Sequence, residues 1–209
     1  MTARLVVAAV ATAVFTVGCA ATPSPPPSDS LSPGPSSGLS PSPTISGPTE
    51  PVPTRPFFPV DLTAIDHTLL AVLPPTVGGL ALEAAPEAEA EIAADPDVAA
   101  LFERFASAIA VDAVSGDFVF VTVLAARAGL MDGEVFRSYR DSFDEGACSQ
   151  AGGVAGNAQA FIGDHTVFIG SCEGGVRTHH TWIEDRDLIV SISSVGAPRL
   201  GEAIMSDLR

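Results

Sequence analysis

Three histidines are the residues of this sequence that most directly suggest chemistry. His179 and His180 are adjacent, in a segment whose composition predicts a strand. Neighbouring side chains of a strand point to opposite faces, so the pair should not share one metal ion. A metal site built from His165, one member of the pair and a carboxylate is one hypothesis, although zinc and copper need convergent ligands that this spacing does not specify. The alternative is that the pair are polar strand residues flanking Trp182.

Two further segments invite a functional hypothesis that their residues do not support. Acidic residues gather in one run, but they lack the Asp-x-Asp-x-Asp-Gly pattern of a calcium loop, so we expect a solvated acidic face. The run comprises Glu83, Glu87, Glu89, Glu91, Asp95 and Asp97. Gly152 to Gly156 lacks the Lys-Ser/Thr of a phosphate-binding loop, and residues 57–209 contain no Gly-x-Ser-x-Gly elbow. The sequence therefore predicts no particular catalytic residue, metal ligand or cofactor.

The charge of the chain excludes one class of partner. Among 209 residues there are 25 acidic and 10 basic ones, which gives a net charge of −15. All the basic residues are Arg. Nucleic-acid binding depends on a basic surface that contacts phosphates, so we expect no nucleic-acid partner.

The first 19 residues have the pattern of an export signal. Arg4 precedes an apolar stretch, Leu5 to Val17, which is shorter than the roughly 20 residues that a membrane span requires. The stretch ends in Thr16-Val17-Gly18-Cys19, which resembles the lipobox of bacterial lipoproteins. That resemblance implies removal of residues 1–18 and attachment of a diacylglyceryl group to Cys19, the new N-terminus. The alternative is an ordinary secretory signal that happens to contain a Cys.

Residues 19–56 are predicted to form a disordered tether behind the lipidated Cys19. Thirteen of the 18 prolines lie between Pro23 and Pro59, and the segment has few charged or large apolar side chains. Such a composition buries too little apolar surface to offset the entropy of ordering. Its prolines favour extended conformers of about 3.1 Å per residue. We therefore expect a spacer between the membrane and a globular domain spanning residues 57–209.

Cys148 and Cys172 remain after Cys19 is assigned to the lipid. An even pair in an exported chain favours a disulfide, which would close a loop of about 25 residues. A redox or metal-binding pair is the alternative, but no Cys-x-x-Cys spacing is present.

The elements that would position these residues can be predicted from periodicity. Strands are expected at 117–126, 156–162, 166–172, 177–183 and 188–194, the first of them in the middle of a sheet because both of its faces are apolar. A short strand is also expected near Leu80.

Four helices are expected from apolar stripes and capping residues. One begins near Asp61, with Leu62, Ile65, Leu69 and Val72 on one stripe. The next follows Asp95-Pro96, with Val98, Leu101, Phe102, Phe105 and Ile109. The third is capped by Asp132 and carries Val135, Phe136, Tyr139 and Phe143, and the last begins at Pro198 with Leu200, Ala203, Ile204 and Leu208 inward. The Ala/Glu-rich segment from Glu83 to Asp95 could form a further weak helix. The fold class is α+β, an antiparallel sheet of about five strands with packed helices and one disulfide.

Two functional hypotheses follow from this organisation. The first is a lipid-anchored module on the extracytoplasmic face of the cell membrane, which binds a small molecule or an envelope protein through a pocket or an apolar patch on the sheet. The second is an extracytoplasmic enzyme of unrecognised type, in which His165, His179 or His180 meets carboxylates in a cleft, with or without a metal. Beyond its signal, the chain also resembles the small Cys-pair domains of surface lipoproteins from high-GC bacteria, and this resemblance assigns no functional residue.

Overall fold

The computed structural model describes residues 63–196 and 199–209. The predicted signal, the lipid attachment at Cys19 and the tether lie outside the described residues, as does Pro198. Among the helices that are described, none has the length and apolar character needed to cross a membrane.

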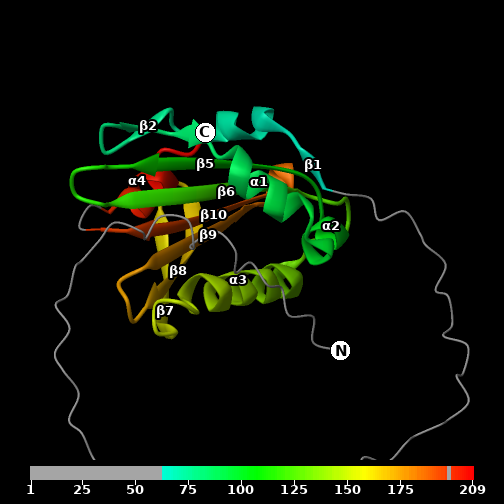
Figure 1. Ribbon diagram of the computed structural model, residues 1–209. Helices are drawn as coiled ribbons and strands as arrows, with labels where there is room; N and C mark the ends of the chain where they lie inside the picture. Colours follow the sequence, from blue (N-terminus) through cyan, green and yellow to red (C-terminus); the bar gives the residue numbers. More distant parts are fainter. Residues whose placement is uncertain (1–62, 197–198) are drawn as a thin grey trace, which may run out of the picture. The chain divides into compact units, whose positions relative to one another are not determined.

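One large sheet organises the described residues. Its strands run in the order β1-β5-β6-β10-β9-β8-β7 (Figure 1). The short strand β4 also pairs with β5. The strands are β1 (Ala64–Ile65), β4 (Glu83–Ala84), β5 (Phe102–Val111), β6 (Phe118–Ala126), β7 (Val154–Ile162), β8 (His165–Cys172), β9 (Arg177–Ile183) and β10 (Leu188–Val195). A second, two-stranded sheet is formed by β2 (Thr76–Val77) and β3 (Leu80–Ala81).

The sheet is mixed rather than purely antiparallel, and it has more strands than expected. Strands β7 to β10 form the predicted antiparallel meander, and β6 lies in the middle of the sheet between β5 and β10, as predicted. The short strand β1 pairs with β5 in parallel, and the sheet has eight strands instead of about five. The two-residue strands β1 and β4 are too short to produce a periodic signal, so the sequence could not reveal them.

Helices cover both faces of the sheet. The helices are α1 (Pro86–Ala93), α2 (Pro96–Leu101), α3 (Gly133–Cys148), α4 (Leu200–Ser206) and the 3-10 helices η1 (His67–Val72) and η2 (Glu184–Arg186). Apolar residues of α1, α2 and α3 form one core with Phe102, Phe105 and Leu124. Apolar residues of η1, β2 and α4 form a second core on the opposite face. Figure 1 shows α3 lying along the sheet on one side, while η1 and β2 lie above β5.

The predicted helix after Asp95 is wrong over most of its length. Asp95 does cap a helix, accepting hydrogen bonds from the backbone N–H groups of Asp97 and Val98, but α2 ends at Leu101. Residues Phe102 to Val111 then form strand β5, which pairs with β6 along its whole length. The residues of this strand that face the second core are alanines, whereas Phe105 faces the first core. Large apolar residues at this spacing, with alanines between them, are also typical of a helix that buries one face. Pairing with β6 makes the segment a strand instead.

The other helix predictions are confirmed in part. Helix α3 begins after the Asp132 cap and buries Phe136, Tyr139 and Phe143 as expected. The segment near Asp61 instead forms β1 and η1, although Leu69 and Val72 are buried. The Ala/Glu-rich segment forms β4 and α1. In α4, Leu200 and Ile204 point inward as expected, but Ala203 is exposed and Met205 is buried in its place.

The predicted disulfide between Cys148 and Cys172 is confirmed. It joins the last residue of α3 to the last residue of β8, across a sequence separation of 24. Both cysteines are buried. The bond therefore fixes the end of α3 against the sheet, on the side where α3 approaches β9.

We expect the double variant Cys148→Ser/Cys172→Ser to lose roughly 3 kcal/mol of unfolding free energy, because the unfolded chain regains the freedom of the loop that the disulfide closes. Urea denaturation followed by circular dichroism would measure the loss, and adding a reductant to the unaltered protein should reproduce it. An unchanged denaturation midpoint in both cases would show that the bond does not stabilise the fold.

Candidate functional site

Strand β9 places its polar residues alternately on the two faces of the sheet. Thr178 and His180 face α3, whereas Arg177 and His179 face α4, as the alternation of strand side chains requires. The prediction that His179 and His180 point to opposite faces is therefore confirmed. Each histidine belongs to a separate environment.

His165 joins neither member of the pair. It is the first residue of β8 and is half-buried. Ile169, four residues after His165 on β8, is the residue that pairs with His179 of β9. At about 3.3 Å per residue, His165 is on the order of 13 Å from that register position. Within residues 63–196 and 199–209, no three His, Cys, Asp or Glu side chains come together in a way that could hold a metal ion.

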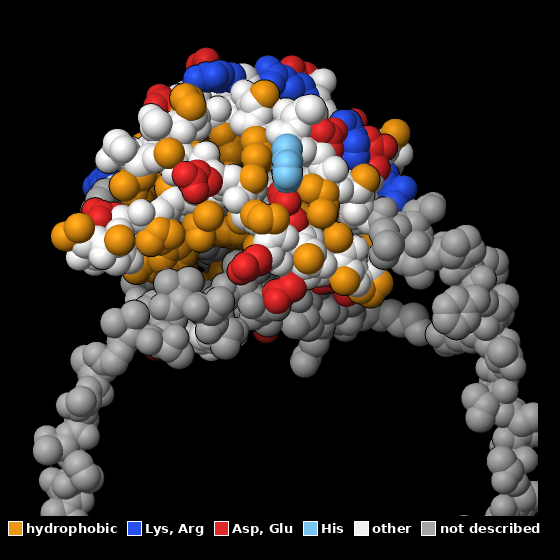
Figure 2. Space-filling view, turned by 45° about the horizontal axis from the view of Figure 1, so that its top comes forward, with side chains coloured by type: hydrophobic (Ala, Val, Ile, Leu, Met, Phe, Trp, Pro, Cys, Tyr) orange, Lys and Arg blue, Asp and Glu red, His pale blue; other side chains and the backbone are white. Residues whose placement is uncertain are grey.

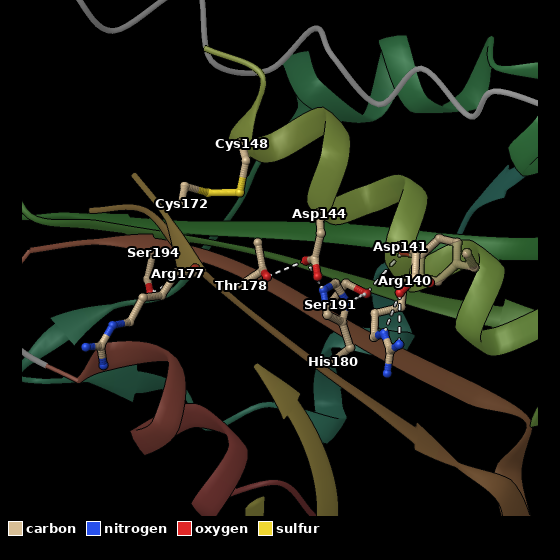
Figure 3. Close-up of polar contacts among 11 residues, drawn as sticks. Arg140, Asp141, Asp144, Cys148, Cys172, Arg177, Thr178, His180, Ser191 and Ser194 are labelled. Carbon is tan, nitrogen blue, oxygen red and sulfur yellow. Dashed lines mark hydrogen bonds and ion pairs between the residues drawn. A yellow bond between two sulfur atoms is a disulfide. The ribbon is translucent and has the colours of Figure 1, made fainter. Parts of the chain in front are cut away.

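On the α3 face, a chain of hydrogen bonds connects the helix to two strands (Figure 3). The Nε2 atom of His180 lies 2.9 Å from Oδ1 of Asp144, and its Nδ1 atom lies 2.9 Å from Oγ of Ser191. The hydroxyl of Thr178 donates to the same Asp144 oxygen. The hydroxyl of Tyr139 donates to Ser191 over 3.1 Å. Asp144 and Tyr139 belong to α3, so the chain links the helix to β9 and β10.

Every donor in this chain has an acceptor when His180 is neutral. Tyr139 donates to Ser191, Ser191 donates to Nδ1 of His180, and Nε2–H donates to Asp144. Burial lowers the pKa of His180, and the hydrogen bond to Asp144 opposes that shift. A neutral His180 ring agrees with both the lowered pKa and the hydrogen bond from Nε2–H to Asp144.

The combination of Ser191, His180 and Asp144 has the residue types of a hydrolase triad, but it is closed to substrate. Ser191 and His180 are both 0 % exposed. Gly170 of β8 packs against the Asp144 carboxylate, and a Cβ atom at this position would lie 2.7 Å from Oδ2. A nucleophile must reach a reacting carbonyl, so a serine with no exposed surface cannot act as one. The chain of hydrogen bonds therefore joins α3 to the sheet.

On the α4 face, His179 has no such partners in the described part of the chain. It is 1 % exposed, and neither ring nitrogen has a hydrogen-bond partner among the described residues. Its Nδ1 and Cε1 atoms face Gly201 of α4 so closely that a Cβ atom there would collide with the ring. Burial, the main cause, lowers the pKa of His179 from 6.5 to about 4, and the nearby positive charge of Arg177 contributes to the shift. The ring is therefore neutral at physiological pH.

His179 lines a pocket of about 340 Å³ between the β8–β9 turn, the ends of β9 and β10, and the start of α4. The lining comprises Gly175, Arg177, His179, Ser194, Gly196, Arg199, Gly201 and Glu202. The Oε1 atom of Glu202 lies 3.6 Å from Nη1 of Arg177, and its Oε2 atom lies 3.6 Å from Nε of Arg199. Figure 3 shows Arg177 and Ser194 away from the Asp144 cluster. The pocket thus combines two guanidinium groups, one carboxylate and a neutral imidazole.

The acidic segment is not wholly a solvated face. Glu89 is 1 % exposed, which corrects the prediction for this residue. Its carboxylate accepts hydrogen bonds from the backbone N–H of Ser107 and from Nε2 of His67, over 2.8 Å in each case. Glu83, Glu87 and Glu91 are exposed as expected. Glu89 therefore attaches α1 to β5 and η1.

Exposed large apolar side chains come from several parts of the described chain. The large hydrophobic residues found exposed among those described are Ile65, Val111, Val114, Leu130, Val154 and Phe161, from several different elements. Figure 2 shows one face on which hydrophobic side chains are interspersed with acidic and uncharged ones. Scattered exposure of this kind is ordinary for a protein surface. The pocket at His179 is therefore the better candidate for a binding site.

Comparison with models of known protein families, with curated protein sequences and with solved structures finds no match for this chain.

Sequence reasoning missed the residues that complete both environments of β9. Asp144 is one helical turn before Cys148, on the buried side of α3, and a lone acidic residue on an apolar stripe is a recognisable signal. Ser191 gave no signal, because small polar residues are common in strands. Arg177 and Glu202 are distant in sequence and meet only when α4 packs on the sheet.

We expect Ser191→Ala to lower the unfolding free energy by roughly 1–3 kcal/mol, because it leaves the buried Tyr139 hydroxyl and His180 Nδ1 without their partner. Ser193→Ala, a change on the same strand face at a half-buried position, is the matched control and should cost less. Chemical denaturation would measure both losses. Labelling of Ser191 in the folded protein by a fluorophosphonate probe would contradict the view that it is closed to substrate.

We expect the unfolding free energy to fall as the pH drops from about 6.5 to 4. The pKa of His179 is near 4 in the folded protein and near 6.5 when unfolded, so the unfolded state binds more protons in this window and stability rises with pH. His179 alone should contribute up to about 3 kcal/mol of this change. Denaturation at several pH values should therefore give a shallower dependence for His179→Gln, with His165→Gln as the control. Identical slopes for His179→Gln and the unaltered protein would refute the low pKa.

Proposed function

We propose that this chain is a bacterial lipoprotein, anchored through Cys19 on the extracytoplasmic face of the cell membrane, whose α+β domain binds a small ligand. The observation that carries the binding function is the pocket at His179, where two arginines lie beside a carboxylate and the buried imidazole has no partner among the described residues. Buried polar atoms without hydrogen bonds are rare in folded proteins. Arg177 and Arg199, whose side chains are 54 % and 80 % exposed, are the groups of the pocket that a ligand can reach.

The disulfide supports the location outside the cytoplasm. Cys148 and Cys172 are joined and buried in the domain. Such bonds persist in oxidising compartments and are rare in the cytosol. An exported domain with a structural disulfide agrees with the signal pattern that ends at Cys19.

Binding is preferred over catalysis for a specific reason. The histidine that meets a carboxylate, His180, is enclosed with Asp144 between α3 and the sheet. The histidine that lines the pocket, His179, is neutral and has no hydrogen bond to a carboxylate among the described residues. A general base or acid needs a pKa near the operating pH, and a pKa of about 4 is far below it.

Mass spectrometry of the full chain, produced in a bacterium and extracted from its membranes with detergent, tests the proposal. We expect a chain that begins at Cys19 with a diacylglyceryl group, carries an intact disulfide, and holds a non-covalent adduct that is lost on denaturation. Cys19→Ala should accumulate as an unprocessed precursor, whereas Ser24→Ala, a tether change outside the lipobox, should be processed normally. Release of an unlipidated chain into the medium would refute the anchor, and a lipidated chain without any adduct would argue against a tightly held ligand.

A further inference from the structure

Strand β7 forms one edge of the large sheet. It is the last strand in the sheet order, and β8 is the strand with which it pairs among the described residues (Figure 1). From Val154 to Ile162, every one of its residues is exposed or half-buried. An edge strand presents a row of backbone N–H and C=O groups that can pair with another strand. Strand β7 is therefore a surface on which the sheet can be extended.

This edge is not protected in the way that sheet edges usually are. Proteins block edges with charged side chains, with Pro or by keeping the edge strand very short. The residues from Val154 to Ile162 include no charged residue and no Pro. A bulge between Val154 and Gly156 distorts the start of the strand, and the register with β8 is regular from Gly156 to Ile162. At the other edge, β1 and β4 have only two residues each, so the long unpaired edge is that of β7.

The alternation of an antiparallel ladder shows which backbone groups of β7 are directed outward. A two-residue loop connects β7 to β8, and its first residue, Gly163, has a φ of +59°. The residues that flank such a loop form a hydrogen-bonded pair, here Ile162 and its partner on β8, and such pairs alternate with open ones along the ladder. Counting back from Ile162, we find that Asn157, Gln159 and Phe161 direct their N–H and C=O groups away from β8.

A second copy of β7 fits these outward groups. In an antiparallel pair related by a two-fold axis, the same surface must fit itself. An axis at Gln159 places Gln159 of each copy opposite Gln159 of the other, and it pairs Asn157 with Phe161 twice. These three hydrogen-bonded pairs would exchange about six backbone hydrogen bonds. On the other face of the sheet the same register sets Gly156, which has no side chain, opposite the bulkier Ile162.

The distribution of charge agrees with pairing between copies. Each chain carries a net charge of −15, so two copies repel each other wherever acidic surfaces meet. The uncharged segment from Val154 to Ile162 lets two copies pair without setting like charges opposite each other. The same segment offers a charged partner no complementary group.

The length of the edge sets the strength of the contact. The regular segment from Gly156 to Ile162 is about 23 Å long at roughly 3.3 Å per residue. A single strand pair of this length is small beside the roughly 1,600 Å² of a standard interface, so we expect a reversible dimer with a dissociation constant of micromolar order.

The predicted tether is a poor partner for this edge. The described chain begins at Thr63, directly before β1, and β1 lies at the opposite edge of the sheet, about 29 Å from β7 at roughly 4.8 Å per strand. Thirteen of the 18 prolines lie between Pro23 and Pro59. Pro has no backbone N–H to donate to a ladder, so a segment of this composition is not suited to add a strand.

We propose that two copies of this chain pair through antiparallel β7 strands around a two-fold axis at Gln159, which joins their two sheets into one. This proposal goes beyond the proposed binding of a ligand and does not depend on the pocket at His179.

Sedimentation equilibrium of the full chain in density-matched detergent, across roughly 1–200 μM, tests the pairing. We expect a dimer whose population rises with concentration. Gln159→Glu sets two carboxylates opposite each other at the axis and should weaken the dimer roughly tenfold or more, as should Gln159→Lys with two ammonium groups. An equal mixture of the two variants should recover the association, because opposite charges then face each other.

The matched control for these variants is Gln150→Glu. Gln150 is exposed in the turn after α3, so this change adds the same charge outside β7 and should leave the dimer unchanged. A full chain that stays monomeric at every concentration would overturn the proposal. So would equal weakening by Gln150→Glu and Gln159→Glu, since the effect would then come from net charge alone.

Cross-linking identifies what occupies the edge in cells. Gln159→Cys in the full chain, treated with a short bismaleimide in intact bacteria, should give a product of twice the mass of the chain, because the two side chains at the axis are close together. Val114→Cys, at a position 97 % exposed in the turn between β5 and β6, is the control and should give no such product. A product from Gln159→Cys that contains a different protein in place of the second copy would refute the self-pairing.

Discussion

Strand β9 is covered by helices on both faces, and four consecutive polar residues, Thr178 to Thr181, are therefore buried within it. A buried polar group that loses water must find another partner or destabilise the fold by roughly 1–3 kcal/mol. This requirement determines what lies on each side of the strand. On the side of α3 the partners come from the chain itself, through Asp144 and Ser191.

The two faces of β9 meet the requirement in different ways because the helices above them differ. Helix α3 is 16 residues long, is held at its end by the disulfide, and brings a carboxylate directly over His180. Helix α4 has seven residues and presents Gly201 to His179, where a larger residue would collide with the ring. A glycine brings no side-chain hydrogen-bonding group, so His179 is packed but has no hydrogen-bond partner within residues 63–196 and 199–209. The same strand therefore supports a closed polar network on one face and an open pocket on the other.

The sequence predicts the part of this arrangement that depends on local patterns. Strands β7 to β10, the Asp132 cap of α3, the opposite orientation of the two histidines and the disulfide all follow from alternation, capping and cysteine count. The error at Phe102 to Val111 has a tertiary cause: apolar residues spaced for a helix also suit a strand whose two faces are both buried, and pairing with β6 settles the outcome. The network and the pocket could not be predicted because their members, such as Asp144 with His180 and Arg177 with Glu202, meet only through packing. Asp144, an acidic residue on the apolar stripe of α3, is a signal from which a buried partner could have been inferred.

The overall charge of the chain sets the conditions under which the pocket at His179 can act. With a net charge of −15, the protein repels anions at long range, and this repulsion is screened beyond about 10 Å at 0.1 M salt. Two of the ten arginines nevertheless meet at this pocket, one carried by β9 and the other beside α4. Short contacts with their guanidinium groups must therefore provide the attraction that long-range charge does not.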